Sequence, residues 1–204
     1  NFFKLFATWE RARRYVCVVL VGVPIWYGVA ILTALSPEIG KAMGMATAPN
    51  AGRAIMFCYI GLAAGDFSSG ALSQIMKSRK KVLVGFVALT ALFVAAYFAF
   101  ASSSLATFYT CVALVGFGGG YWAVFVTVAS EQFGTNLRAT ATTTAPNFVR
   151  GSVVLLTLLF KVLKDKVGIV QSAEIVGAVV LAFALVSIAG FGESYGKDLD
   201  FVEE

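Results

Sequence analysis

The sequence contains no histidine. Histidine is a common metal ligand and the usual general base in enzymes, so its absence argues against di-iron desaturases, zinc membrane proteases and Ser-His intramembrane proteases. Cysteine is scarce as well, and Cys17, Cys58 and Cys111 all lie in apolar stretches, so no disulfide framework is predicted. We therefore expect a protein that is not an enzyme and that holds no metal and no other cofactor.

Charge is also scarce. Only 13% of the residues are charged, whereas a soluble globular domain carries roughly 25%. Apolar residues make up 59% of the chain and the mean hydropathy is +0.83. This composition predicts an integral membrane protein, and its net charge of +5 needs no nucleic-acid partner to explain it.

Six apolar stretches recur along the chain, each about the 20 residues that a helix needs to cross a bilayer. Backbone amides in lipid must bond within their own segment, so each stretch is predicted to be a helix. The predicted fold class is an all-α membrane protein with six transmembrane helices in one bundle. The stretches are 15–36, 53–76, 82–101, 105–130, 139–163 and 168–191.

The bundle fills residues 15–191 and leaves a segment at each end. Residues 1–14 are amphipathic and predict an interfacial or linker segment, and residues 192–204 predict a polar tail. An even number of spans puts both ends on one side, and placing them in the cytoplasm puts most Lys and Arg residues there. We expect a multi-pass protein of the plasma (inner) membrane, with a chain that starts in mid-protein because it lacks an initiator Met.

The loop at residues 37–52 is the longest on the opposite side. Ser36 followed by Pro37 and Glu38 is typical of a helix start, with a capping hydroxyl, a first-turn proline and a first-turn acid. The sequence therefore predicts a short surface helix after the first span.

Three motifs follow helix ends in a fixed order. The first runs from Gly70 to Lys81, with Leu72, Gln74 and a cluster of basic residues; the second is Glu131, six residues, then Arg138; the third is the tail from Glu193 to Leu199. Together they resemble the loop signatures of the major facilitator superfamily, with Gln74 in the place of the family's Asp and Gly192 in the place of the tail's leading Pro.

The resemblance covers nearly the whole chain and implies the C-terminal half of such a transporter, helices seven to twelve, built as two inverted three-helix repeats. It implies alternating access, with this bundle rocking against an N-terminal six-helix half, the missing partner, around a midplane site. The solute would be a small carboxylate or a sugar-like molecule, coupled to a proton or another cation. The alternatives are an intramembrane enzyme and a channel-type module.

Charged residues beside the loops are predicted to form a network. Glu131 is placed to pair with Arg79 or Lys80, and Arg138 with a carboxylate of a neighbouring loop. Such contacts can hold helix ends together in one transport state and release them in another. A static surface contact worth about 0 to 1 kcal/mol is the competing interpretation.

Two charges are predicted to lie inside the membrane at matching depth. Asp66 is ten residues before Met76, about 15 Å from that helix end, and Arg150 is eleven residues beyond Ala139, about 16 Å. A charge at the bilayer centre costs at least about 2.5 kcal/mol, so both should face a cavity or each other. Arg150 is a candidate to bind the solute and Asp66 a candidate proton or cation site; a buried structural pair is the alternative.

Other candidate solute contacts come from three predicted helices. Asn147 precedes Arg150 by three residues and so shares its helix face. By the family resemblance the first and fourth helices line the central cavity, which makes Trp26, Tyr27, Tyr121 and Trp122 candidate aromatic contacts. Packing in the core or against lipid is the competing interpretation for these aromatics.

Small residues recur every four positions on the second and fourth spans. Gly61 and Gly65 are followed by Ser69 and Ser73, and Gly116 is followed by Gly120. This spacing predicts close helix–helix packing. The run around Gly118 also lies near mid-membrane, where a loosened helix suits a solute site.

Overall fold

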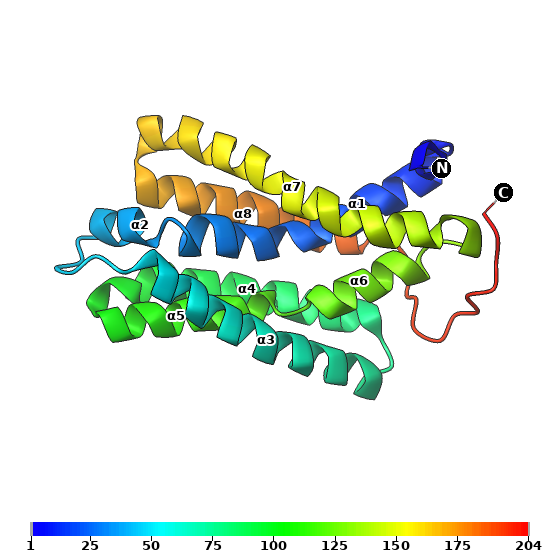
Figure 1. Cartoon of the computed structure of the whole chain (residues 1–204), viewed down its shortest axis with the longest axis horizontal. Helices are drawn as coiled ribbons and strands as arrows, with labels where there is room; N and C mark the ends of the chain where they lie inside the picture. Colours follow the sequence, from blue (N-terminus) through cyan, green and yellow to red (C-terminus); the bar gives the residue numbers. More distant parts are fainter. Residues whose placement is uncertain (1, 204) are drawn as a thin grey trace.

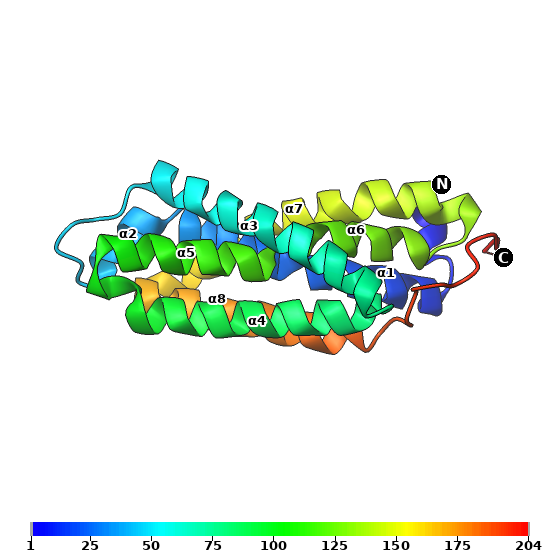
Figure 2. The same cartoon turned by 90° about the horizontal axis from the view of Figure 1, so that it is seen from below.

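The computed structural model describes residues 2–203, and every regular element in that range is a helix. Six helices among these residues are long and apolar enough to cross a membrane. They run side by side along the long axis of the molecule, and the two chain ends lie together at one end of the bundle (Figure 1, Figure 2). The predicted all-α fold with six apolar helices is confirmed, and the arrangement suggests a multi-pass membrane protein.

The six spans use most of the chain. They are α1 (Trp9–Tyr27) continued by the π-helix η2 (Gly28–Thr33), α3 (Ala51–Ile75), α4 (Arg79–Phe100) continued by η3 (Ala101–Ser103), α5 (Leu105–Gly119) with α6 (Trp122–Glu131), α7 (Thr135–Val167), and α8 (Ile169–Ile188).

Several spans extend beyond their predicted bounds, among them α1 and α7. The helix α1 begins at Trp9 because the Thr8 hydroxyl accepts the backbone N–H of Arg11 at 3.4 Å, which caps the helix end. Residues 9–14, predicted as part of an interfacial or linker segment, are therefore helical and continuous with the first span. The helix α7 has 33 residues and continues to Val167, where Gly168 ends it with a φ of 87°.

Two short elements flank the first span. The 3-10 helix η1 (Phe2–Phe6) precedes it, and α2 (Ser36–Ala42) is the predicted surface helix, with Pro37 and Glu38 in its first turn. The predicted capping role of Ser36 is wrong, because the cap residue is Leu35. The Ser36 hydroxyl is buried and finds no hydrogen-bond partner within residues 2–203.

The helices α3 and α5 pack so closely that their backbones touch. A side-chain carbon at Gly61 would overlap the Ala113 carbonyl oxygen, and one at Gly65 would overlap the Phe117 carbonyl oxygen. The predicted close packing of the small residues is therefore confirmed. This contact brings the middle of α3 against the middle of the fourth span.

The fourth span is broken near its centre. The helix α5 ends at Gly119, Gly120 and Tyr121 leave the helical path, and α6 restarts at Trp122. Gly120 lies directly against Gly65 of α3, where a side chain would overlap the α3 backbone. The break thus faces α3 and exposes the start of a new half-helix to it.

Candidate functional site

A cavity of about 310 Å³ lies beside the break in the fourth span. Five elements contribute to its wall: α1, η2, α3, α6 and α7. We name it the midspan cavity because Arg150 and Trp122 in its wall lie near the middle of their spans. Its lining residues are Ile25, Trp26, Val29, Tyr59, Leu62, Trp122 and Arg150.

Asp66 reaches the broken span from α3. Its Oδ1 accepts the backbone N–H of Ala123 at 3.1 Å, so the carboxylate caps the N-terminus of α6. A helix N-terminus carries exposed N–H groups and a partial positive charge, both of which stabilise an anion. Asp66 follows Leu62 by four residues and so lies one turn from the cavity wall on the same side of α3.

Arg150 does not pair with Asp66. Within residues 2–203 its guanidinium makes no ion pair; Nη1 donates to Asn147 Oδ1 at 3.3 Å, and the group lies 5.2 Å from the centre of the Trp122 ring. The expected mutual pair is thus absent among the described residues: Arg150 lines the cavity, whereas Asp66 neither lines it nor pairs with Arg150 and instead caps α6. A cation over an aromatic face is attracted by the ring and keeps hydrogen-bond donors free for a ligand.

Two tryptophans form the aromatic part of the wall. The rings of Trp26 and Trp122 meet edge to face with centroids 6.4 Å apart. The indole N–H of Trp26 is buried, and no acceptor for it exists within the described residues. An unpaired buried donor costs about 1 to 3 kcal/mol, so the packing around Trp26 must offset that cost.

Tyr27 and Tyr121 are not cavity residues in this structure. Both side chains are fully buried. The Tyr27 hydroxyl donates to the Ala173 carbonyl at 2.7 Å, and the Tyr121 hydroxyl donates to the Val21 carbonyl at 2.9 Å. The prediction that they contact a solute is corrected here: they tie α1 to α8 and the fourth span to α1, because their hydroxyls satisfy backbone carbonyls inside the bundle.

Asn147 lies on the exposed surface of α7, beside Arg150. Its side-chain amide donates to the Thr143 carbonyl at 3.0 Å, and its oxygen accepts from Arg150. It does not line the midspan cavity but a separate apolar groove between α1 and α7 that includes Phe148 and Leu155. Its contact with the cavity is therefore indirect, through the orientation of Arg150.

A second cluster lies at the end of the bundle that carries both termini. The Arg79 guanidinium pairs with Glu131, Nη2 to Oε1 at 3.2 Å, and only 12% of each side chain is exposed. Arg79 also donates to Ser73 Oγ at 2.6 Å, and Ser194 Oγ donates to Glu131 at 2.7 Å. The expected contact between Glu131 and Arg79 is present, and together these contacts join α3, α4, α6 and the tail in what we name the terminal-end network.

The other two predicted members bind backbone carbonyls instead of carboxylates. Lys80 Nζ donates to the Phe191 carbonyl at 2.9 Å. Arg138 donates to the carbonyls of Phe133 and Leu199. Among residues 2–203 Arg138 pairs with no carboxylate, contrary to the prediction, because the tail passes over the start of α7 and presents its own carbonyl groups there.

Glu193 completes the terminal-end network, and the sequence reasoning did not select it. Its carboxylate accepts from the Ser78 hydroxyl and from the backbone N–H groups of Arg79 (2.9 Å), Lys80 (3.3 Å) and Tyr195 (3.0 Å), so it caps the N-terminus of α4. Burial alone would raise the pKa of Glu193, but these hydrogen bonds outweigh it and lower the pKa from 4.5 to about 2. The acid at the head of the tail motif was the signal that could have identified it.

Comparison with known proteins finds no family model that matches the chain and no curated protein that matches it in sequence.

Proposed function

We propose that this chain is the C-terminal six-helix half of a secondary transporter of the major facilitator type, moving a small organic solute by alternating access. Both termini would lie in the cytosol, and an N-terminal six-helix half would close the other side of the pathway. The observation that carries the proposal is Arg150, which lies near the middle of a long apolar helix, without a carboxylate partner in residues 2–203, in a cavity beside a broken span.

The wall of the midspan cavity favours a particular class of solute. Arg150 offers a planar set of donors that suits carboxylates and hydroxyl groups, and the Trp26 and Trp122 rings add an aromatic wall. The cavity volume, about 310 Å³, falls at the small end of the range for small-molecule sites. These features support a small carboxylate or a sugar-like solute.

The capping contact of Asp66 supports a role in coupling. The negative charge of the Asp66 carboxylate is attracted by the partial positive charge at the N-terminus of α6. Binding a proton or a cation would weaken that attraction and release the half-helix that carries Trp122. Broken helices whose ends face a midplane site are the usual place for coupling ions in transporters. Asp66 is therefore the proposed proton or cation site.

The terminal-end network is the proposed gate on the side of the chain ends. The Arg79–Glu131 pair is largely shielded from water, so breaking it on opening requires a compensating interaction elsewhere. In this proposal the two inverted repeats move relative to each other when the network opens. In the competing interpretation the terminal-end network is only a structural contact. Its removal would then lower the stability of the protein and leave the solute affinity unchanged.

The test is binding of solutes, read from the fluorescence of the cavity tryptophans. Two of the three tryptophans line the cavity, and Trp9, which is 81% exposed, can be replaced by Phe to lower the background. We expect one member of a panel of organic acids and sugars to change the emission of the Trp9→Phe chain, and Arg150→Ala to weaken that binding at least about tenfold. Arg53→Ala, at an exposed arginine of α3, is the matched control.

Transport itself requires the complete protein in proteoliposomes. A carrier exchanges labelled solute for unlabelled solute without net flux, whereas a channel does not, and an enzyme would convert the solute. Unchanged uptake and unchanged affinity after Arg150→Ala would reject the proposed binding role. Failure of every solute in the panel to bind or exchange would reject the proposed transport function.

A further inference from the structure

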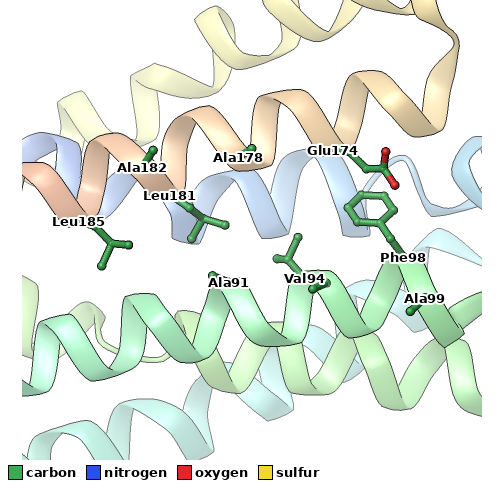
Figure 3. A pocket seen from close by; sticks show the side chains of 10 residues that line it. Ala91, Val94, Phe98, Ala99, Glu174, Ala178, Leu181, Ala182 and Leu185 are labelled. Atoms are coloured by element: carbon green, nitrogen blue, oxygen red, sulfur yellow. The ribbon is translucent and has the colours of Figure 1, made fainter.

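A long groove between α4 and α8 is separate from every site described above. Its volume is about 730 Å³, and its wall is apolar except at one end, where Glu174 stands opposite Phe98 (Figure 3). We name it the α4–α8 groove. Its lining residues are Ala91, Val94, Ala95, Phe98, Ala99, Glu174, Ala178, Leu181, Ala182 and Leu185.

The groove has the dimensions of one leaflet of a bilayer. Glu174 lies five residues after Ile169, the first residue of α8, or about 8 Å from the start of that helix. From Glu174 to Leu185 the groove covers eleven residues of α8, about 16 Å. Half of a hydrocarbon core of about 30 Å is nearly the same length. Measured along α8, the groove thus runs from about 8 Å to about 24 Å from the start of the helix, so the carboxylate lies at the end nearer the membrane surface and the apolar wall lies at acyl-chain depth.

Small side chains keep the groove open. Alanines recur every four residues on α4, at Ala91, Ala95 and Ala99, and again on α8 at Ala178 and Ala182. The two helices therefore face each other across the groove with little side-chain volume at these positions. A flexible hydrocarbon chain fits such a space without rearrangement of the helices.

Glu174 has no cation partner within residues 2–203. Its side chain is exposed, and no hydrogen bond or ion pair to it exists among those residues. Covering it with an apolar helix would bury an unpaired charge, which costs several kcal/mol. A lipid with a headgroup ammonium avoids this cost because the occupant carries the opposite charge with it.

We propose that the α4–α8 groove binds a phospholipid whose headgroup carries a primary ammonium group, of the phosphatidylethanolamine kind. The ammonium donates hydrogen bonds to the Glu174 carboxylate, and one acyl chain lies along the alanine-lined wall as far as Leu185. Lipids with a methylated headgroup offer no N–H donor, and anionic headgroups repel the carboxylate. The groove therefore selects among lipids by charge and by hydrogen-bond donors.

The experiment compares lipid retention by the full chain. The protein is purified in mild detergent, mixed with phosphatidylethanolamine, phosphatidylcholine and phosphatidylglycerol of identical acyl chains, and examined by native mass spectrometry. We expect about fivefold greater retention of phosphatidylethanolamine, the size that one exposed ion pair gives. Glu174→Gln is expected to abolish this preference, and Glu174→Asp to keep most of it. Glu38→Gln, at an exposed carboxylate of α2, is the matched control.

A second variant separates the headgroup contact from the groove. Ala178→Leu fills the apolar wall and is expected to lower retention of all three lipids, with no change in their order. Equal retention of the three lipids by the unmodified chain, or an unchanged preference in Glu174→Gln, would overturn the proposal. So would efficient cross-linking of Ala178→Cys between two chains in the membrane, which would show a second copy in the groove.

Discussion

The Asp66 carboxylate accepts the backbone N–H of Ala123 at 3.1 Å, so a side chain of one span caps a half-helix that belongs to another. The contact exists because Gly65, the preceding residue of α3, lies against Gly120 with no side chain between the two backbones. Close packing and capping are therefore parts of one arrangement, and the midspan cavity lies beside it.

Replacing Asp66 by Ala removes the cap. We expect a loss of about 0.5 to 2 kcal/mol in the free energy of unfolding, the usual cost of losing an N-cap. Asp66→Asn keeps a capping oxygen and should recover most of that loss. Thermal unfolding in detergent, followed by circular dichroism, measures both variants. Equal destabilisation by Ala and by Asn would show that the charge, and not the cap, stabilises α6.

Substitutions at two glycines of α3, Gly65 and Gly70, test the packing of α3 on the fourth span. A side-chain carbon at Gly65 would overlap the Phe117 carbonyl oxygen, whereas one at Gly70 would meet nothing within 4 Å. We expect Gly65→Ala to destabilise the protein by about 1 to 3 kcal/mol. Gly70→Ala should be neutral or stabilising by up to about 1 kcal/mol, because Ala has the higher helix propensity. A tolerated Gly65→Ala would contradict the close contact.

The lowered pKa of Glu193 predicts that the free energy of unfolding depends on pH. Its pKa in the folded protein, about 2, lies below its ordinary value of 4.5. Its stabilising contribution is thus fully present above about pH 4.5 and is lost as the pH falls towards 2. We expect this contribution to the free energy of unfolding to be about 1 to 2 kcal/mol, a value that already allows for the partial exposure of Glu193 to solvent. Unfolding of Glu193→Gln should depend less on pH in this window, while the control Glu38→Gln should follow the unmodified protein.

The Arg79–Glu131 pair can be measured by a double-mutant cycle. Replacing each residue by Gln, singly and together, isolates their interaction. We expect a coupling free energy of about 1 to 3 kcal/mol, because both side chains are largely shielded from solvent.

A comparison for that cycle is the Arg14–Glu10 pair, in which Glu10 is 73% exposed, although Arg14 is 19% exposed and also pairs with Glu203. The coupling between Arg14 and the exposed Glu10 at this helical spacing is expected to be about 0.3 to 0.5 kcal/mol. If the two cycles gave the same coupling, the terminal-end network would contribute no more than an ordinary surface pair.

The sequence predicted the number and approximate positions of the helices better than the residues at which they begin and end. Six runs of apolar residues suffice to predict six spans, because lipid leaves the backbone no other structure. The start of α1 depends on the Thr8 cap, which lies in a polar segment that hydropathy alone assigns to a linker. Likewise Ser36 was expected to cap α2, but the N-cap position is held by Leu35, which makes no capping hydrogen bond, and the Ser36 hydroxyl is buried.

The candidate site was predictable in part. Arg150 and Asp66 are conspicuous as charges in apolar stretches, and the glycine run near Gly118 pointed to the broken span. Whether an aromatic faces a cavity or the core depends on helix rotation, which sequence spacing cannot give; Trp122 lines the cavity while its neighbour Tyr121 is fully buried. Glu174 was missed because it lies close to a predicted helix end, where a charge attracts little notice.

The length of α7 has a mechanical consequence. Its 33 residues correspond to about 50 Å, well beyond a hydrocarbon core of about 30 Å. A helix of this length responds to a thinner bilayer by tilting further from the membrane normal. Arg150 lies near the midpoint of α7, so a change in the tilt of α7 would shift the guanidinium relative to the Trp122 ring. Bilayer thickness would in this way tune the cavity from outside the protein.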